Sequence, residues 1–280
     1  MKYEIYFKHL LNTIEEALEK ALPAEGQRPS AIHEAMRYAV FPRGKRFRAV
    51  LTLSAAEAAG GRLQDALLPA IALELIHSYS LVHDDLPALD NDATRRGKPS
   101  CHKRFGEAVA LLAGDGLLTL AFQVLSRYEP AERLPQLLEE ISTAAGSYGM
   151  IGGQVAELTT GKENLDLPML DFISTHKTGK LIKAGAAAGA IAVGASQALR
   201  ERMMKLGEFL GLAFQLIDDL LDGDGYARLM KPKEIRDKVR DLIASAKRET
   251  RPLGKKAEKL QTIADFLLQR LPRISHVAVG

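Results

Sequence analysis

Two groups of aspartates each follow a long apolar run of the sequence. They are Asp84, Asp85 and Asp90 in the first group and Asp218, Asp219 and Asp222 in the second. Carboxylates four residues apart share one face of a helix, a turn apart. Crowded at the end of an apolar helix, such carboxylates repel one another and resist losing water. A hard divalent cation removes that repulsion, and oxygen-only ligands favour Mg²⁺, which keeps waters and bridges to substrate phosphates.

One such group alone could simply end a helix that faces water. Two groups in the same context favour a site, because facing each other across a cavity they would form a clamp for several metal ions. Pro87 lies inside the first group, so we expect the helix to end or kink there and let Asp90 fold back.

Basic residues lie in three segments that could hold phosphate oxygens. They are residues 44–48 (GKRFR), Arg95 with Arg96, and residues 176–180 (HKTGK). Guanidinium groups bind phosphate oxygens in pairs, and lysine acts as a point charge. Each segment by itself could be a solvated face, but next to two carboxylate groups they are better interpreted as ligands. The chain has neither a P-loop nor a GxGxxG turn after a strand, so a nucleotide is not implied.

Helices must position these residues. Apolar spacing of three and four predicts them over Tyr6–Leu22, Ile32–Val40, Ala49–Ala59, Ala66–His83, Gly106–Tyr128, Leu134–Leu158, Leu167–Val193 and Gln197–Leu221, with two more near the C-terminus. No long alternating β pattern and no flexible linker interrupts them. We therefore expect an all-α protein, with residues 1–280 forming a single-domain bundle of many helices around a central cavity.

Composition narrows the function class. Net charge is only +3, and acids are interspersed in the basic stretch Lys231–Lys259, so we expect no nucleic-acid partner. The N-terminal segment is charged throughout, and the stretch between Lys183 and Arg200 is mostly Ala and Gly, so we expect no membrane insertion. A single cysteine, Cys101, fits a reducing, cytoplasmic location.

The motifs resemble those of the trans-prenyl diphosphate synthases, most closely the bacterial farnesyl diphosphate synthases. The resemblance runs from Met1 to Asp222 and resumes near Tyr226. It rests on Glu74–Ala108, Gly44–Arg48, Gly152–Gln154 (GGQ), His176–Leu181 and Phe214–Asp222. It implies condensation of isopentenyl diphosphate with dimethylallyl or geranyl diphosphate to give farnesyl diphosphate and pyrophosphate, by a homodimer.

Residue roles follow from this resemblance. Three Mg²⁺ ions on the allylic diphosphate would be held by Asp84, Asp85, Asp90, Asp218, Asp219 and Asp222. Catalysis would rest on five of these, Asp222 excepted, together with Lys177. The allylic diphosphate would be oriented by Arg95, Lys177, Thr178 and Gln215, and isopentenyl diphosphate by Gly44, Lys45, Arg48, His77 and Arg96. No cysteine nucleophile is needed, so Cys101 has no catalytic role.

Tyr79 is the candidate for setting product length. It lies five residues before Asp84, about 7.5 Å along a helix. In the family, a bulky aromatic residue there closes the floor of the channel, which favours a product of fifteen carbons. The alternatives are that Tyr79 is a packing residue and that the product is geranylgeranyl diphosphate.

The resemblance is interrupted after Asp222. The family has a longer loop there that carries a further lysine, whereas only residues 223–225 precede Tyr226. Either the loop is deleted in this protein or it is missing from the sequence. A real deletion would leave open a catalytically weak partner subunit as the function. A terpene cyclase is a third reading, but it would need neither the second aspartate group nor the cations at Lys45 and Arg48.

Overall fold

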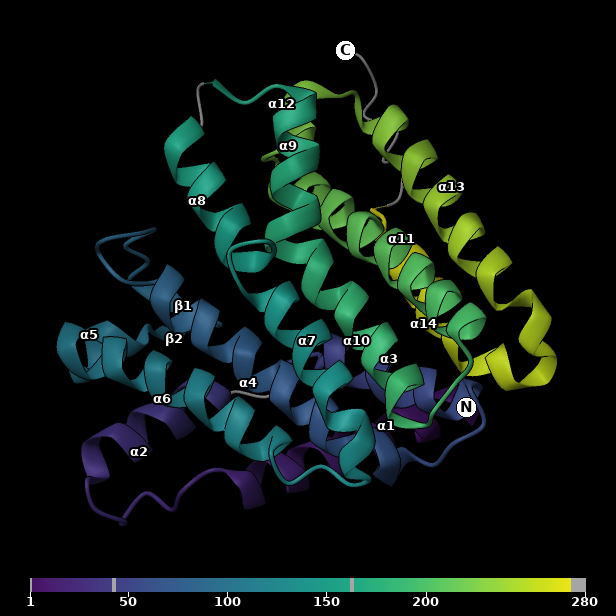
Figure 1. Ribbon diagram of the computed structural model, residues 1–280. Helices are drawn as coiled ribbons and strands as arrows, with labels where there is room; N and C mark the ends of the chain where they lie inside the picture. Colours follow the sequence, from purple (N-terminus) through teal and green to yellow (C-terminus); the bar gives the residue numbers. More distant parts are fainter. Residues whose placement is uncertain (1, 42–43, 162–163, 273–280) are drawn as a thin grey trace.

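The computed structural model describes residues 2–41, 44–161 and 164–272, and helices make up nearly all of it (Figure 1). The α-helices are α1 (Lys2–Ala21), α2 (Ser30–Val40), α3 (Phe47–Ala58), α4 (Leu67–Asp84), α5 (Cys101–Phe105), α6 (Glu107–Leu125), α7 (Leu134–Ala145), α8 (Met150–Thr160), α9 (Leu167–Ile173), α10 (Lys180–Ala192), α11 (Gln197–Asp222), α12 (Tyr226–Leu229), α13 (Pro232–Thr250) and α14 (Glu258–Arg270). Shorter 3-10 turns are η1 (Leu63–Ala66), η2 (Ala131–Arg133) and η5 (Arg251–Ala257), and η4 (Ser174–Gly179) is π-helical. The all-α prediction is confirmed.

Two short strands were not predicted. β1 (Thr94–Arg95) and β2 (Lys98–Pro99) pair antiparallel, with Thr94 opposite Pro99. Arg96 and Gly97 form the turn between them, both with positive φ. Two residues per strand are too few to leave an alternating pattern in the sequence.

The small residues of α10 let this helix sit at the centre of the bundle. It packs against α3, α4, α7 and α11, and its residues from Ala184 to Ala192 are buried. A Cβ on Gly189 would lie 2.2 Å from the Thr52 carbonyl oxygen of α3, so the two backbones touch. The Ala- and Gly-rich stretch therefore is a closely packed core helix, as predicted.

Two of the predicted helices are interrupted. The stretch Leu134–Leu158 is broken between α7 and α8, where a Cβ on Gly149 would overlap the Ala144 carbonyl oxygen at 2.0 Å. The stretch Leu167–Val193 changes from α-helical to π-helical hydrogen bonding in η4 and back again in α10. The apolar periodicity continues through both interruptions, which is why the sequence predicted single helices.

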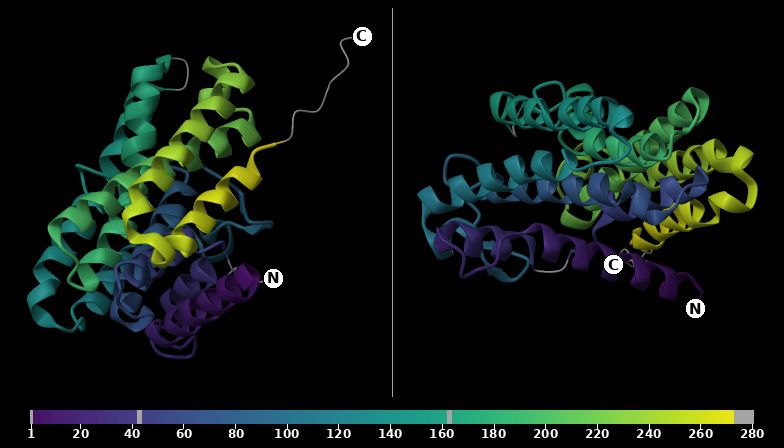
Figure 2. Two further views of the ribbon diagram at one scale, coloured as in Figure 1. Left: turned by 90° about the vertical axis from the view of Figure 1, so that its right-hand side faces the viewer. Right: turned by 60° about the horizontal axis from the view of Figure 1, so that its bottom comes forward.

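The C-terminal helices bring the end of the described chain to the site. Helices α13 and α14 lie side by side (Figure 2), and α14 also contacts α3 and α11. The basic segment at the start of α3 and the aspartates at the end of α11 therefore both have α14 as a neighbour.

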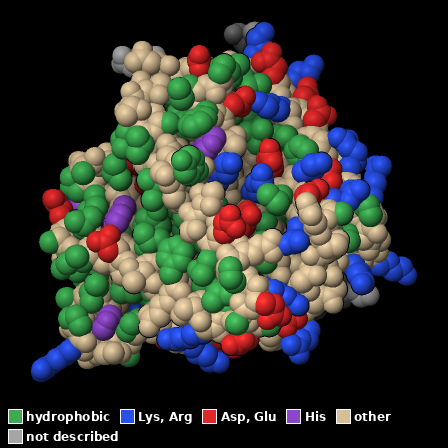
Figure 3. All heavy atoms as spheres, viewed as in Figure 1, with side chains coloured by type: hydrophobic (Ala, Val, Ile, Leu, Met, Phe, Trp, Pro, Cys, Tyr) green, Lys and Arg blue, Asp and Glu red, His purple; other side chains and the backbone are tan. Residues whose placement is uncertain are grey.

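Two helices are long and apolar enough to cross a membrane by length and composition alone: Leu63–Asp84, whose apolar window is 67% buried, and Glu107–Leu125, 44% buried. The first is a core helix. The second leaves Leu111 and Leu112 exposed on α6. Hydrophobic side chains are numerous on the left of the molecule in Figure 3, where Figure 1 places α6 and α8, and α8 also has exposed apolar side chains. Those of α8 are Ile151, Val155 and Leu158. We call these five side chains the α6–α8 face.

Candidate active site

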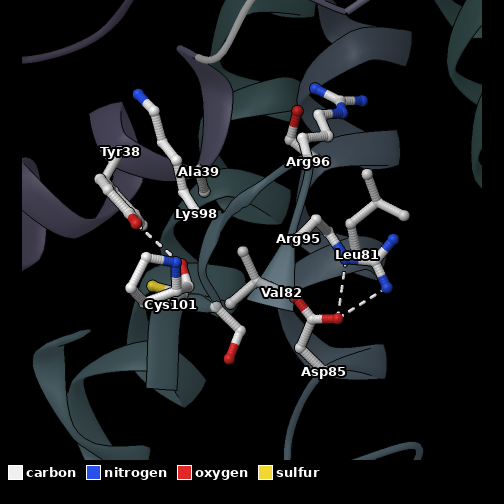
Figure 4. Close-up of a pocket in the computed structure, with 12 residues that line it drawn as sticks. Tyr38, Ala39, Leu81, Val82, Asp85, Arg95, Arg96, Lys98 and Cys101 are labelled. Atoms are coloured by element: carbon white, nitrogen blue, oxygen red, sulfur yellow. Dashed lines mark hydrogen bonds and ion pairs between the residues drawn. The ribbon is translucent and has the colours of Figure 1, made fainter. Parts of the chain in front are cut away.

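The first aspartate group is divided between two cavities. Asp84 ends α4 and lines a cavity of about 430 Å³ together with Lys177 and Thr178. Asp85 is buried and points to the other side, where its Oδ1 accepts hydrogen bonds from Arg95 Nε at 2.7 Å and Nη2 at 2.6 Å (Figure 4). Asp90 folds back as predicted, because its backbone N–H donates to the Asp84 carbonyl oxygen at 2.9 Å.

The charge on Asp84 is costly in the metal-free protein. Burial raises the pKa of Asp84 to about 6, and repulsion from Asp90 and Glu157 contributes, while Lys177 and Arg95 only partly offset it. A partly buried carboxylate with negatively charged neighbours is stabilised by a cation. The chemistry of this group therefore fits a divalent metal ion.

Asp85 and Arg95 also line the second, much smaller cavity shown in Figure 4. Its volume is about 30 Å³, room for one water molecule. Cys101 lies on its wall, and burial raises the pKa of its thiol to about 11. The protonated thiol agrees with the expectation that Cys101 has no catalytic role.

The second aspartate group is held by neighbouring donors. Asp219 is buried, and its Oδ1 accepts from Gln215 Nε2 at 2.7 Å while its Oδ2 accepts from the Tyr226 backbone N–H at 2.9 Å. Asp218 forms an ion pair with Arg270 of α14 at 2.6 Å. Burial raises the pKa of Asp219, and the charge on Asp218 contributes. Asp222, the last residue of α11, is exposed.

Gly225 lets the chain close tightly over Asp219. Its φ is +48°, and a Cβ there would lie 2.0 Å from Asp219 Oδ2. Any other residue would be strained and would displace the carboxylate. The short connection after Asp222 therefore fixes one acid of the second group.

A chain of hydrogen bonds runs from the wall of the Asp84 cavity to the second aspartate group. Thr178, which lines the cavity of Asp84, donates from Oγ1 to Gln215 Oε1 at 2.9 Å, and Gln215 in turn donates to Asp219. The resemblance paired Thr178 and Gln215 with one substrate, and the structure brings them into contact.

The π-helical segment η4 presents Lys177 and Thr178. A Cβ on Gly153 of α8 would lie 2.3 Å from the Lys177 backbone nitrogen, so this glycine of the GGQ motif lets α8 pack on the backbone of η4. Segments of π-helix inside α-helices are frequent at functional sites. Lys177 forms an ion pair with Glu157, also of α8.

The residues predicted to hold isopentenyl diphosphate come from the segment before α3, from α3 and α4, and from the β1–β2 turn. Arg48 is buried, and its Nε has no hydrogen-bond partner among the described residues. A Cβ on Gly44 would lie 2.9 Å from Arg96 Nη2, and the Arg96 guanidinium therefore covers Gly44. Desolvation, helped by Arg48 and Arg96, lowers the pKa of His77 well below its ordinary value. His77 is therefore neutral at pH 7. Lys45 is exposed at the edge of this group.

Not every cation in the GKRFR motif is available for phosphate. Arg46 donates to Glu15 at 2.9 Å and to the Val40 carbonyl oxygen at 2.8 Å, and it lies 3.8 Å from Glu74. It is 3% exposed. This arginine therefore ties α1, α2 and α4 together, consistent with its omission from the predicted ligands.

Tyr79 lines the same cavity as Asp84. Its side chain is 5% exposed, and its ring packs edge-on against His83 with 5.7 Å between centroids. Its hydroxyl is buried without a partner in the described part of the chain, and burial raises its pKa to about 12. A buried hydroxyl without a partner costs free energy, so packing alone accounts poorly for a tyrosine here.

The residues present fit Mg²⁺ bound together with a diphosphate. Among the described residues, no three side chains of His, Cys, Asp or Glu are gathered closely enough to hold a metal ion by themselves. Mg²⁺ commonly takes one or two carboxylates and completes its shell with waters and substrate phosphates. One or two carboxylates for a Mg²⁺ ion could come from Asp84 and Asp90 in the first group, and the same number from Asp218 and Asp219 in the second.

Two residues of the site were missed from the sequence. Glu157 contacts Lys177, and it lies only three residues beyond the GGQ motif, which was its available signal. Arg270 contacts Asp218 from 52 residues away and carries no motif.

Comparison with known proteins identifies the family of this chain. The polyprenyl synthetase family model matches residues 29–246. A dimethylallyltranstransferase of Fischerella ambigua is 40% identical over 288 residues, covering 95% of this chain and 83% of the relative. A farnesyl diphosphate synthase of Geobacillus stearothermophilus is 43% identical over 230 residues, covering 79% and 77%. A geranylgeranyl diphosphate synthase of Cyanophora paradoxa is 36% identical over 280 residues, covering 92% and 93%.

Solved structures agree as well. The crystal structure of an FPP/GFPP synthase from Zymomonas mobilis superposes with a TM-score of 0.90 at 34% identity, covering 95% of this chain and 99% of that one. With the fold, the family model and the site in accord, the chain belongs to the polyprenyl synthetase family and is a prenyltransferase.

Proposed function

We propose that the protein condenses isopentenyl diphosphate head to tail with dimethylallyl and then geranyl diphosphate, and that farnesyl diphosphate is its main product. The observation that carries this proposal is the cavity of about 430 Å³ that is lined by Asp84, Lys177 and Thr178 together with Tyr79. Phosphate-binding groups and an apolar channel thus belong to one cavity, as a diphosphate with a growing hydrocarbon tail requires.

The allylic diphosphate would bind between the two aspartate groups. Lys177 supplies positive charge in the cavity, and Thr178 supplies a hydroxyl that Gln215 orients. Arg95, whose guanidinium is bound to Asp85 outside this cavity, adds positive charge that also acts on Asp84. Bound Mg²⁺ would supply Lewis-acid stabilisation of the negative charge on the departing pyrophosphate. Isopentenyl diphosphate would be held by the five ligands predicted for it: Gly44, Lys45, Arg48, His77 and Arg96.

The reaction breaks the C1–O bond of the allylic diphosphate and forms a bond from C1 to the C4 alkene carbon of isopentenyl diphosphate. A proton then leaves C2 of the isopentenyl unit, with pyrophosphate as its acceptor. Charge stabilisation by fixed cations lowers the barrier most where water is excluded. Leu118 and Met150 line the channel and present apolar surface to the allylic cation there.

Product length is the finer part of the proposal. Relatives named for farnesyl and for geranylgeranyl products match at similar identity. Tyr79 favours the shorter product, because its ring occupies the channel wall about 7.5 Å from Asp84 along α4.

The α6–α8 face favours a homodimer, which we include in the proposal. Five large apolar side chains, each 44–55% exposed, belong to α6 and α8, two helices that both contribute residues to the wall of the Asp84 cavity. Ile151, Val155 and Leu158 also line the cavity of Asp84, so a second copy on this face would close its wall. Soluble, cytoplasmic location remains part of the same proposal.

The first experiment is incubation with radiolabelled isopentenyl diphosphate and dimethylallyl, geranyl or farnesyl diphosphate, with Mg²⁺ or with EDTA, followed by chain-length analysis. A fifteen-carbon product that disappears with EDTA supports the proposal. A twenty-carbon product would keep the synthase and reject the role of Tyr79. Absence of product with every primer would favour a partner subunit, with the short segment after Asp222 as the cause.

A further inference from the structure

Tyr226 contacts three other helices from its place at the start of α12. Its side chain is buried, and its backbone N–H donates to Asp219 Oδ2 of α11 at 2.9 Å. Its hydroxyl donates to Asp171 Oδ1 of α9, and Lys238 Nζ of α13 lies over its ring, 5.2 Å from the centroid. The backbone of Tyr226 therefore binds a predicted metal ligand, while its hydroxyl binds a different helix.

The partners of the Tyr226 hydroxyl lie next to the π-helical segment η4. Asp171 is in α9, directly before η4, and Ser174 is the buried first residue of η4. Burial raises the pKa of the Tyr226 hydroxyl, the hydrogen bond to Asp171 adds to this effect, and a hydrogen bond with Ser174 opposes it. The hydroxyl therefore stays protonated at pH 7 and joins α12 to the segment that presents Lys177 and Thr178.

These contacts close a ring of hydrogen bonds around the second aspartate group. Thr178 of η4 donates to Gln215 Oε1 at 2.9 Å, and Gln215 donates to Asp219 Oδ1 at 2.7 Å. Asp219 also accepts from Tyr226, whose hydroxyl donates to Asp171, and the chain from α9 back to η4 completes the ring. Each oxygen of Asp219 accepts one bond in this ring and keeps a lone pair for a metal ion. The ring therefore orients this carboxylate without occupying it.

Resting on the function proposed above, we propose that Tyr226 and Asp171 are positioning residues, which hold Asp219 at a fixed place relative to Lys177 and Thr178. Neither side chain is among the described residues that line the cavity of Asp84, so both act through the residues that they hold. Without the contact between them, α12 is free to move relative to α9. Binding of Mg²⁺ and diphosphate must then order Asp219 as well, which weakens the binding.

The test compares variants that break this contact with variants that keep it. Tyr226→Phe removes the donor, Asp171→Ala removes the acceptor, and the double variant removes both. Asp171→Asn keeps an acceptor oxygen and serves as the rescue variant. Tyr128→Phe is the matched control, because it removes another buried tyrosine hydroxyl, which donates to the Ala192 carbonyl oxygen at 2.6 Å.

Two measurements are made without turnover. Amide hydrogen exchange in EDTA, followed by NMR, reports how often the Tyr226 backbone N–H separates from Asp219. Calorimetry gives the Mg²⁺ concentration for half-saturation in the presence of geranyl S-thiolodiphosphate, which does not react. The first measurement reads the position of Asp219 in the metal-free protein, and the second reads its consequence for metal binding.

We expect Tyr226→Phe and Asp171→Ala each to speed exchange of the Tyr226 amide about 10-fold and to raise the half-saturating Mg²⁺ concentration several-fold. The double variant should not exceed the larger single effect, since both changes break one contact. Asp171→Asn should resemble the wild type. Tyr128→Phe should lower the free energy of unfolding and change neither measurement.

Unchanged exchange or an unchanged Mg²⁺ requirement in Tyr226→Phe would overturn the proposal, and so would effects that multiply in the double variant. If Tyr226→Phe does not fold, Asp171→Ala gives the same test, because its side chain is 48% exposed and its loss leaves no cavity.

Failure of the proposed function gives a different pattern. A protein that shows these shifts but forms no product from the natural substrates would contradict the synthase activity and keep the roles of Tyr226 and Asp171. A protein that forms product and lacks the shifts would contradict these two roles alone.

Discussion

Asp84→Asn should stabilise the metal-free protein while abolishing its activity. Burial raises the pKa of Asp84 from 3.8 to about 6, so this carboxyl stays protonated to a higher pH in the folded protein than in the unfolded chain. Ionising it in the fold therefore costs free energy. A rise of this size corresponds to about 3 kcal/mol, since one pKa unit is worth 1.36 kcal/mol.

The direction of this pKa shift determines the pH range in which Asp84 lowers the stability of the fold. Below pH 3.8 the carboxyl is protonated in both the folded and the unfolded state, so it does not lower the stability of the fold. Between pH 3.8 and about 6 the loss of stability grows, and above about pH 6 it has its full value. Asparagine carries no charge at any pH. In EDTA, Asp84→Asn should thus raise the free energy of unfolding by about 3 kcal/mol at pH 7 and by little at pH 3.5.

Urea unfolding in EDTA measures this difference. With a slope of about 3 kcal/mol/M, the midpoint at pH 7 should rise by about 1 M. The exposed Asp241→Asn is the matched control, expected within about 0.5 kcal/mol of the wild type. Product formation by Asp84→Asn should fall about 100-fold or more. The reasoning would be refuted if Asp84→Asn failed to stabilise at pH 7, or if its advantage persisted at pH 3.5.

Three further substitutions test the geometry. Tyr79→Ala opens the channel wall, so chain-length analysis should show products longer than fifteen carbons, and an unchanged product would contradict the role of the ring. Gly153→Ala places a Cβ 2.3 Å from the Lys177 backbone nitrogen. Thermal melting should show that the free energy of unfolding falls by about 1–3 kcal/mol, and steady-state kinetics should show a higher KM for the allylic primer. A normal KM would contradict the role of Gly153 in positioning Lys177. Gly225→Ala places a Cβ 2.0 Å from Asp219 Oδ2, so calorimetry should show a raised Mg²⁺ requirement, and an unchanged one would mean that the carboxylate is free to move.

Sequence reasoning located the residues whose side-chain type is unusual for the surrounding sequence. Acids at the ends of apolar runs, such as Asp84 and Asp219, stand out because burying charge is costly. The family resemblance added Thr178 and Gln215, which the structure places 2.9 Å apart. Their roles toward metal and substrate stay predictions.

The residues that were missed are ordinary in their local context. Arg270 lies on an amphipathic helix where arginine is common, and only packing of α14 against α11 brings it to Asp218. Likewise, the division of the first group, with Asp85 facing Arg95 and away from Asp84, depends on where the helix ends. The break at Gly149 had a signal in its glycine, but apolar spacing continued across it.

The π-helical segment η4 has a consequence for insertions and deletions. A π-turn holds one residue more than an α-turn, so removing one residue from Ser174–Gly179 would join α9 and α10 in one regular helix with both apolar faces still in phase. The fold would survive that deletion, but the side chains of Ser174–Gly179 themselves would change direction, so Lys177 and Thr178 would no longer both face the cavity. A homologue shortened by one residue here should therefore fold and yet bind diphosphate poorly, even with Lys177 and Thr178 retained in its sequence.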